Sequence, residues 1–274
     1  MLVPEPLARS RYARRLDVAI AAVRAAGAAL MELRGSITGE ESAGGQLKTS
    51  TDLAAEGWVL GFIEGSFPNE IILAEERFEQ ARVAWPGAQT YWTIDALDGT
   101  RSYVDGFPGF CVQVAYVEAG VPSVAAIYEP VARHAYVAAV GTGAWRIDAT
   151  GAHLLRGSSA NALSPGLRFV DSTVPGGSVG AIFQQTHGTF IECGSVGLKI
   201  CRVAEDSADV YAKRFTYKLW DVAPGEVLVR EVGAVLTTFD GEPINYSGAG
   251  THYPSIVVAR PDLGAALVRS LRGS

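Results

Sequence analysis

Two aspartates three residues apart, Asp95 and Asp98, stand at the end of an apolar run and directly before a Gly-Thr pair. Residues 91–94 are mostly aromatic or β-branched, which indicates the end of a buried strand, and Gly99 indicates a turn after it. Carboxylates at a strand end supply the oxygen ligands that Mg²⁺ prefers, and backbone amides of the following turn can bind an anion. The pattern predicts a site for a metal ion and a phosphate; the plain alternative is a turn with two solvated aspartates.

Two further acidic segments strengthen this interpretation. Glu75 and Glu76 follow a short apolar run at 71–74, so they lie at the end of a second predicted strand. Asp221 lies where a helix is predicted to begin, because Pro224 is tolerated in the first turn of a helix. The chain therefore carries three acidic sites that are well separated in the sequence.

These three motifs, in this order, resemble the signatures of the inositol monophosphatase superfamily of Mg²⁺-dependent, lithium-sensitive phosphatases. The motifs are Glu75-Glu76, Asp95-Ala96-Leu97-Asp98-Gly99-Thr100 and Trp220-Asp221-Val222-Ala223-Pro224-Gly225. The resemblance extends from about residue 52 to about residue 246. Ala96 stands where the family usually has proline, which loosens the loop and removes no ligand. The resemblance implies a metal-dependent phosphatase that releases phosphate from a small phosphomonoester.

The alternation of predicted elements and the resemblance together imply an α/β fold, a layered α/β/α/β/α sandwich of the sugar-phosphatase type. Residues 1–150 would form an N-terminal α+β half that carries Glu75 and the pair Asp95 and Asp98. Residues 151–274 would form a C-terminal α/β half that carries Asp221 and the residues facing the substrate. The active site is expected in the cleft between the halves.

The resemblance also implies which residues hold the metal ions, expected to be two or three Mg²⁺. The first ion is assigned to Glu75, Asp95 and the Leu97 carbonyl, the second to Asp95, Asp98 and Asp221, and a third, weaker one to Glu75 and Glu76. Two divalent ions about 3.5 to 4 Å apart can activate a water and offset the charge on the leaving oxygen. Asp95 would bridge the two principal ions.

Further residues are assigned by the resemblance to the phosphate and the water. Gly99 and Thr100 would present backbone amides to the phosphate. Asp52 and the Thr100 hydroxyl would orient the attacking water, so that the catalytic residues are Asp52, Glu75 and Thr100. From the residues alone, Asp52 has a second interpretation as the N-cap of a helix. Glu76 is either a supporting residue of the site or a plain exposed charge.

Three basic residues, Lys199, Lys213 and Arg214, bear on the substrate. Inositol phosphatases usually carry an acidic residue seven positions before the Trp-Asp aspartate, where Arg214 stands. The segments 197–201 and 208–211 are similar to those of the 3′(2′),5′-bisphosphate nucleotidase branch of the superfamily. The three cations would meet a second phosphate, which predicts a bisphosphate nucleotide as the substrate. As the alternative, all three are solvated surface charges.

Other functions stay open beside this one. The substrate alternatives are inositol 1-phosphate, histidinol phosphate and a specialised sugar or nucleotide phosphate. A non-catalytic binding relative is disfavoured because every expected ligand is present. A Gly-x-Ser-x-Gly pattern at 176–180 would suit a serine hydrolase, but Pro175 ends the strand that a nucleophile elbow requires. The four histidines form no His-x-x-x-His pair, so no zinc site is expected.

The composition limits the class of protein. With 274 residues, 48% of them hydrophobic, the chain can bury one large core or two smaller ones. A net charge of −6 without a long basic run argues against a nucleic acid polymer or an anionic membrane as partner. The three cysteines, Cys111, Cys193 and Cys201, lack metal-ligand spacing and are expected to be reduced core residues. We expect a cytoplasmic enzyme whose partner is a small phosphorylated substrate, and a homodimer is left open.

Several elements follow from hydrophobic periodicity. An amphipathic helix is expected over 11–34, with Gly27 on its buried face where another element packs closely. A loop or loose hairpin is expected over 35–50, and then a helix with Ala55, Trp58, Val59, Phe62 and Ile63 on one face. Strands at 110–117, 121–128 and 135–140 form an antiparallel meander. From 167 onward, strands and helices alternate.

Overall fold

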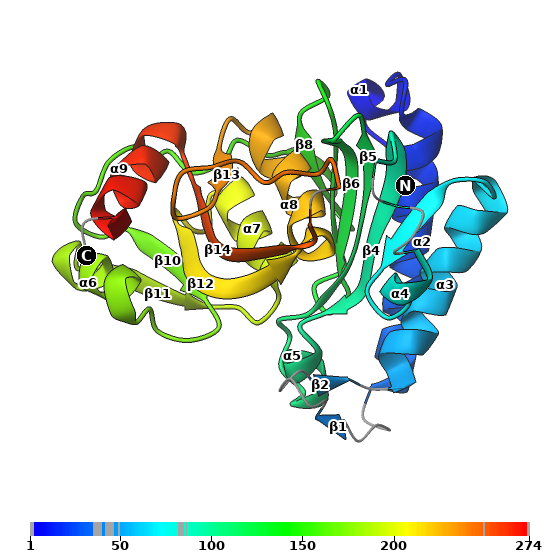
Figure 1. Cartoon of the computed structure of the whole chain (residues 1–274), viewed down its shortest axis with the longest axis horizontal. Coiled ribbons are helices and arrows are strands. Elements are labelled where there is room, and N and C mark those ends of the chain that lie inside the picture. The colour runs from blue at the N-terminus through cyan, green and yellow to red at the C-terminus, as the bar shows by residue number, and fades with distance from the viewer. Residues whose placement is uncertain are drawn as a thin grey trace.

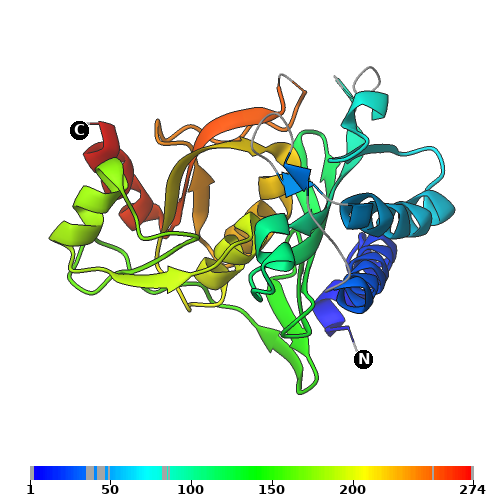
Figure 2. The same ribbon diagram turned by 90° about the horizontal axis from the view of Figure 1, so that it is seen from below.

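The computed structural model describes residues 3–34, 40–41, 47–48, 50–81, 85, 87–248 and 250–272. Five layers follow one another along the longest axis: helices, a large sheet, helices, a second sheet and helices (Figure 1). The view turned by 90° shows the same succession, with the N-terminus beside the first helix layer and the C-terminus beside the last (Figure 2). The α/β/α/β/α fold expected from the sequence is thereby confirmed.

The large sheet has seven strands in the order β3-β4-β5-β6-β7-β8-β9. Its strands are β3 (Ile71–Ala74), β4 (Thr90–Asp98), β5 (Cys111–Glu118), β6 (Val121–Glu129), β7 (His134–Ala139), β8 (Ala144–Asp148) and β9 (Gly151–Leu154). Strands β3 and β4 are parallel, and each later neighbour is antiparallel to the one before it. The predicted meander is therefore confirmed and continues through two more strands.

One face of the large sheet is covered by two long helices. The elements on this side are α1 (Glu5–Ala8), α2 (Ala13–Leu33) and α3 (Ser50–Ser66). Helix α5 (Thr100–Val104) and the short antiparallel pair β1 (Glu40–Glu41) and β2 (Leu47–Lys48) lie at the lower edge in Figure 1. Helix α4 (Phe78–Ala81) packs on the opposite side, because Phe78 and Ala81 contact the core that contains Trp220. Gly27 of α2 lies against Tyr128, since a Cβ on Gly27 would stand 2.5 Å from the Tyr128 Cδ1 atom. The close approach predicted at Gly27 is confirmed. Of the hairpin expected over 35–50, residues 35–39, 42–46 and 49 lie outside the described residues.

The predicted face of α3 is only partly correct. Val59 and Ile63 are buried, but the side chains of Trp58 and Phe62 are 54% and 37% exposed. The buried face includes Glu56 and Leu60 in place of Trp58 and Phe62, and the apolar pattern did not reveal that a carboxylate is buried there.

The other face of the large sheet packs on the central helices, which separate it from the second sheet. The remaining elements are β10 (Arg168–Asp171), α6 (Gly177–Gln185), β11 (Thr189–Glu192), α7 (Val196–Ala204), β12 (Tyr211–Lys218), α8 (Leu219–Glu231), β13 (Val235–Thr237), β14 (His252–Ala259) and α9 (Pro261–Arg272). The second sheet consists of β12-β14-β13 and of the parallel pair β10-β11, joined by a bridge between Phe169 and Val210.

Along β14, successive side chains pack into two different hydrophobic cores. Ile256 and Val258 belong to the core shared with α7 and α8, whereas Val257 and Ala259 belong to the core beneath α6 and α9. Successive side chains of a strand point to opposite faces. The second sheet is therefore buried on both faces, as its nearly continuous apolar sequence at 256–259 requires.

The boundary expected between residues 150 and 151 stays a proposal. The large sheet continues past it, because β9 ends at Leu154. Helix α8 belongs to the C-terminal half by sequence, yet it packs against strands β4 to β8 of the large sheet. The two halves thus share the central helix layer.

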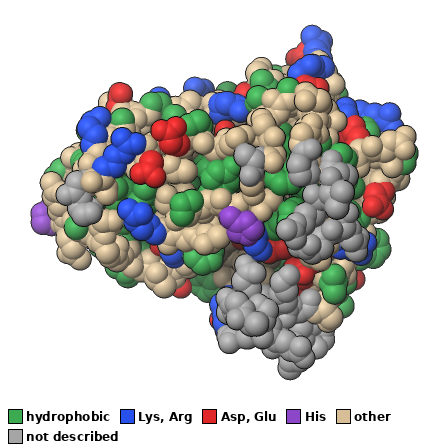
Figure 3. All heavy atoms as spheres, viewed as in Figure 1, with side chains coloured by type: hydrophobic (Ala, Val, Ile, Leu, Met, Phe, Trp, Pro, Cys, Tyr) green, Lys and Arg blue, Asp and Glu red, His purple; other side chains and the backbone are tan. Residues whose placement is uncertain are grey.

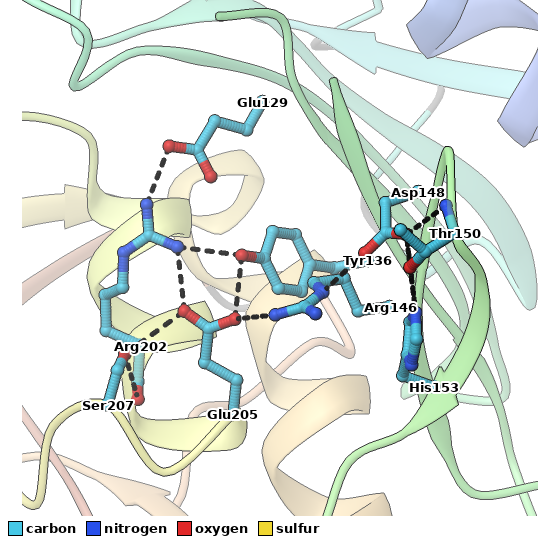
Figure 4. A network of polar contacts seen from close by, with 9 residues as sticks. All are labelled: Glu129, Tyr136, Arg146, Asp148, Thr150, His153, Arg202, Glu205 and Ser207. Carbon is cyan, nitrogen blue, oxygen red and sulfur yellow. Dashed lines mark hydrogen bonds and ion pairs between the residues drawn. The ribbon is translucent and has the colours of Figure 1, made fainter. Parts of the chain in front are cut away.

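A network of polar side chains joins α7 to the large sheet (Figure 4). The Arg202 guanidinium donates to Glu129 on β6 at 2.7 Å and to the Tyr136 hydroxyl on β7 at 2.7 Å. It also pairs with Glu205 at 2.9 Å, and Glu205 in turn contacts Arg146 of β8 at 3.5 Å. The C-terminal end of α7 is therefore held to three strands by charged contacts.

Two simpler expectations concern cysteines and membranes. Cys111, Cys193 and Cys201 are buried and free of disulfide bonds, as predicted. Among the described helices, none combines the length and the apolar composition that crossing a bilayer requires. On the face shown in Figure 3, basic and acidic side chains of the described residues are interspersed.

Candidate active site

A cleft of about 290 Å³ lies where the strand ends of β3 and β4 meet α7, α8 and β12. Its walls include most of the residues singled out from the sequence. The lining residues that the argument uses are Asp52, Glu75, Glu76, Asp95, Leu97, Asp98, Gly99, Thr100, Lys199, Tyr211, Lys213, Phe215, Tyr217 and Asp221. The fold therefore brings residues from both halves of the chain into one cavity.

Glu75, Asp95 and Asp221 form a compact acidic cluster. One carboxylate oxygen from each lies within 4.8 Å of the others. Glu75 follows β3, Asp95 lies in β4, and Asp221 lies in the first turn of α8, where its carboxylate accepts the Lys218 backbone N–H at 2.8 Å. Parallel pairing of β3 with β4 aligns the first two at one edge of the sheet.

The electrostatics of this cluster favour a bound cation. Burial raises the pKa of Asp95 well above its ordinary value, and the charges of Glu75, Asp98 and Asp221 raise it further. Burial likewise raises the pKa of Asp221, with Glu75 the next cause. The Lys218 ammonium lies 2.9 Å from the Glu75 carboxylate and offsets one of these charges. An excess of converging oxygen ligands remains, and it fits a divalent metal ion of the Mg²⁺ type.

Asp98 lies in the same cleft but is engaged by α7. Its Oδ2 atom accepts hydrogen bonds from the Ser195 hydroxyl at 2.6 Å and from the Gly197 N–H at 2.7 Å. Burial raises the pKa of Asp98, and these two hydrogen bonds oppose the shift. Its predicted place in the second metal site stays a prediction, because the compact cluster consists of the other three acids.

The sequence interpretation missed Gln113, which is fully buried on β5. Its amide Nε2 donates to Asp95 at 3.4 Å and to Asp98 at 3.3 Å. Gln113 is the direct cross-strand partner of Asp95 in the antiparallel pair of β4 and β5. The available signal was a single amide within the apolar run 110–117, which is unusual for a buried strand.

Gly99, Thr100 and Asp52 lie beside the acidic cluster. Gly99 has a φ of 93°, and a Cβ there would stand 2.6 Å from the Gly109 carbonyl oxygen, so glycine is required for this turn. The Thr100 hydroxyl lies 3.2 Å from both an Asp52 carboxylate oxygen and the Leu97 carbonyl. The N-cap interpretation of Asp52 is wrong, because α3 begins at Ser50 and Asp52 lies within its first turn.

Glu76 borders the cleft, and its backbone N–H donates to Glu56 of α3 at 2.8 Å. Burial raises the pKa of Glu56 to about 7. The main chain at the end of β3 is therefore fixed by a buried carboxyl group on the neighbouring helix.

Two of the three predicted substrate cations line the cleft. Lys199 is 3% exposed, and its ammonium lies 3.5 Å from Asp171. The Lys213 ammonium lies 2.7 Å from the same Asp171 oxygen and 3.1 Å from the Ser172 hydroxyl. Burial lowers the pKa of Lys199, and Asp171 opposes that shift. Neither lysine is a solvated surface charge of the kind held open as the alternative.

Arg214 does not line this cleft with the two lysines, and its role at the substrate stays a prediction. Its guanidinium lies 4.7 Å from the centre of the Phe239 ring, and the residue lines a second hollow beside α6, which Lys213 and Asp171 also border. Lys213 and Arg214 are successive residues of β12, so their side chains leave opposite faces of the strand. The Arg214 side chain therefore starts from the face of β12 opposite to that of Lys213, although both residues border the hollow beside α6.

The competing hydrolase motif does not form an elbow. Strand β10 ends at Asp171, and Gly176 is the N-cap of α6. The serine at 178 therefore lies in the first turn of a helix at the surface, away from the acidic cluster.

Comparison with known proteins agrees with this geometry. The model of the inositol monophosphatase family matches residues 12–272. A Vibrio cholerae protein named Nus factor SuhB is 30% identical over 270 residues, covering 94% of this chain and 95% of the relative. A Synechocystis inositol-1-monophosphatase is 29% identical over 246 residues, with 85% and 81% coverage. The solved structure of an inositol monophosphatase from Anabaena superposes with a TM-score of 0.78 at 28% identity, covering 96% of this chain and 97% of the other.

Proposed function

The chain belongs to the inositol monophosphatase family and is therefore a metal-dependent phosphatase, and we propose that its substrate is a small 3′(2′),5′-bisphosphate nucleotide. The observation that carries the substrate class is that Lys199 and Lys213 both line the cleft that holds the acidic cluster and both contact Asp171. Two ammonium groups against one carboxylate leave a local positive charge. A second phosphate of the substrate would bind at that charge.

Different residues of the cleft would bind the metal ions and the phosphate. Glu75, Asp95 and Asp221, with Asp98 and the Leu97 carbonyl beside them, would hold the Mg²⁺ ions. Divalent ions held there supply a Lewis acid that activates water and offsets charge on the leaving oxygen. The backbone amides of Gly99 and Thr100 would bind the phosphate that is removed.

Thr100 and Asp52 would position the attacking water. The Thr100 hydroxyl hydrogen points to an acceptor, either the Asp52 carboxylate or the Leu97 carbonyl, each 3.2 Å away. With its own hydrogen committed, the Thr100 oxygen is left to accept a hydrogen bond from a water. A water that donates to Thr100 in this way would keep a lone pair free for attack on the phosphorus atom.

The metal requirement is tested by phosphate release with and without excess chelator. We expect release to stop in chelator and to return when Mg²⁺ is added. Asp95→Asn should abolish turnover while the circular dichroism spectrum stays the same, because Asp95 is the acid surrounded by the other three. Undiminished release in excess chelator would contradict the metal mechanism.

The substrate class is tested by a panel of phosphate esters. The panel contains adenosine 3′,5′-bisphosphate, inositol 1-phosphate, histidinol phosphate, fructose 1,6-bisphosphate and nucleoside monophosphates. A charge-assisted contact to phosphate is worth about 1.5 to 3 kcal/mol, so we expect kcat/KM to favour the bisphosphate nucleotide over inositol 1-phosphate at least about tenfold. Inositol 1-phosphate is the second candidate, favoured by the name of the Synechocystis relative.

A matched pair of variants isolates the second-phosphate contact. Lys213→Met should lower kcat/KM for the bisphosphate about tenfold or more and affect monophosphates little. Arg214→Met removes a charge from the next residue of the same strand, whose guanidinium lies over Phe239 and does not line the cleft. It should leave the preference intact. Equal losses in the two variants, or none in Lys213→Met, would remove the support for a second phosphate.

A further inference from the structure

Phe215 places an exposed apolar ring in the cleft that holds the acidic cluster. The side chain is 53% exposed and lines the same cavity as Asp95, Asp221 and Lys199. About half of this phenylalanine is in contact with water. Covering the ring with another apolar or planar group removes apolar surface from water, which is favourable. The ring is therefore available to a molecule that enters the cleft.

The main chain around Phe215 is shaped to present this ring. Strand β12 pairs with β14 through Arg214 opposite Ser255 and through Tyr217 opposite Tyr253, so one extra residue lies between these pairs on β12. This is a β-bulge, a device that redirects a side chain and recurs beside active sites. The residue of β14 at this point is Pro254, which has no N–H to donate to the ladder.

Neighbouring aromatic rings hold Phe215 in place. Its ring meets Tyr217 edge to face, with centroids 5.6 Å apart and an angle of 71° between the planes. Tyr217 is itself fixed, because its hydroxyl lies 2.9 Å from the Tyr211 hydroxyl and both tyrosines are buried. An edge contact leaves a face of the Phe215 ring for a ligand.

We propose that Phe215 is the platform on which the base of a nucleotide substrate stacks, an inference that rests on the proposed function. Lys213 and Phe215 are alternate residues of one strand and line the same cleft. Two residues of extended chain span at most about 7 Å. Lys213 and Phe215 are therefore close enough for one nucleotide to place a phosphate at the first and a base on the second.

A base fits this surface better than a polyol does. Every nucleobase has a planar π face, and stacking on an aromatic side chain depends little on which base it is. Inositol offers hydroxyl groups and no π face. Phe215 would therefore separate nucleotides from polyol phosphates, and it would separate adenine from other bases only weakly.

The test compares Phe215→Ala with Phe215→Trp on substrates with and without a base. The substrates are adenosine 3′,5′-bisphosphate and the corresponding abasic sugar bisphosphate. In Phe215→Ala, the ratio of their kcat/KM values should fall about 5- to 150-fold, mainly through a higher KM for the nucleotide. Phe215→Trp keeps a stacking face and should preserve or raise the ratio. Trp58→Ala is the control, because Trp58 is equally exposed and lies outside the cleft.

Each outcome separates this inference from the proposed function. An equal loss on both substrates, or no loss in Phe215→Ala, would overturn the stacking platform even when the wild-type enzyme prefers the bisphosphate nucleotide. If the wild-type enzyme hydrolysed nucleoside monophosphates instead, only the proposed binding of a second phosphate would be contradicted. The Phe215 variants would then be compared on AMP and ribose 5-phosphate. A wild-type enzyme that hydrolyses no nucleotide would overturn both.

Discussion

At the scale of single residues, Lys218 combines two roles at the acidic cluster. Its backbone N–H donates to Asp221, and its ammonium lies 2.9 Å from Glu75. The ammonium is also 5.3 Å from the centre of the Trp220 ring. A protein cation beside Glu75 stabilises the acidic cluster when no metal is bound, and it would compete with a metal ion for this proposed ligand.

Removing this charge should strengthen metal binding. Two unit charges 4 Å apart interact by about 4 kcal/mol at an effective dielectric constant of 20, so Lys218→Met should lower the Mg²⁺ dissociation constant roughly tenfold or more. The metal-free variant should unfold at a lower temperature, because the carboxylates lose their counter-charge. Isothermal titration calorimetry and thermal unfolding in chelator measure the two effects. Lys213→Met is the control, because it removes a lysine that contacts Asp171 and not Glu75. Weaker Mg²⁺ binding in Lys218→Met would contradict the competition between the Lys218 ammonium and Mg²⁺ for Glu75.

Asp209 shows how a carboxylate far from the cleft contributes stability that depends on pH. It accepts from the Ser158 hydroxyl at 2.6 Å and from the Arg168 guanidinium at 2.6 Å. Burial alone would raise the pKa of Asp209, but these hydrogen bonds outweigh it and hold the pKa below its ordinary value. A lowered pKa means that the folded chain binds fewer protons than the unfolded chain near the ordinary pKa.

The sign of this linkage sets the expected result for Asp209→Asn. The stabilisation is fully present above the unfolded pKa of about 4 and is lost as pH falls through the lower folded value. At pH 7 the variant should lose about 1.5 to 3 kcal/mol of unfolding free energy, the worth of hydrogen bonds to a charged group. Urea unfolding at a series of pH values should show that the difference in unfolding free energy between the wild type and Asp209→Asn becomes smaller below pH 4. Asp240 is exposed, so Asp240→Asn serves as the control and should change the unfolding free energy little at any of these pH values. If the loss of stability in Asp209→Asn became larger in acid, the stabilising role given to the Asp209 carboxylate would be refuted.

At the scale of elements, a Cβ on Gly197 of α7 would stand 2.3 Å from the Gln113 Oε1 atom and 3.3 Å from the Cys111 sulfur, both on β5. The absence of a side chain at Gly197 therefore makes room for the amide that contacts Asp95 and Asp98. The long side chain on the strand and the glycine on the helix depend on each other.

This dependence predicts a non-additive pair of substitutions. Gly197→Ala should cost about 1 to 3 kcal/mol of unfolding free energy, because extra atoms in a packed core force strain. In Gln113→Ser the same alanine should cost clearly less, and the coupling is read from a double-mutant cycle in urea. Gly61→Ala is the control, since a Cβ there meets nothing within 4 Å and a helical alanine is favoured by about 1 kcal/mol. Additive effects of the pair would show that Gln113 moves freely aside.

The sequence predicted the elements whose signals are local. The acids at the ends of β3 and β4 were found because each follows an apolar run and precedes a turn, and both features lie within ten residues. Gln113 was missed because its importance comes from register: it lies across from Asp95 only after β4 and β5 pair. Arg214 was grouped with Lys213 because the two are adjacent in sequence, but successive side chains of a strand leave opposite faces, and only Lys213 lines the cleft.

At the scale of the whole molecule, one core joins the two halves. A single buried cluster contains Cys111 and Val117 of the large sheet together with Cys201 of α7, Leu228 of α8 and Ile256 of the second sheet. The polar contacts of Arg202 with β6 and β7 cross the same interface (Figure 4). Neither half can expose its face of this cluster without losing a large part of its buried apolar surface.

We therefore expect the two halves to unfold together, and the cysteines provide the probes. Cys111 lies on β5 and Cys201 on α7, both fully buried, and burial raises the pKa of each thiol well above its ordinary value. Since the thiolate is the reactive form, labelling by a thiol reagent should require unfolding. In single-cysteine variants, the urea midpoints for labelling Cys111 and Cys201 should coincide with each other and with the loss of helical circular dichroism. Labelling of Cys201 at clearly lower urea would mean that the C-terminal half opens first, and the shared central helices would then be a docked surface between two domains.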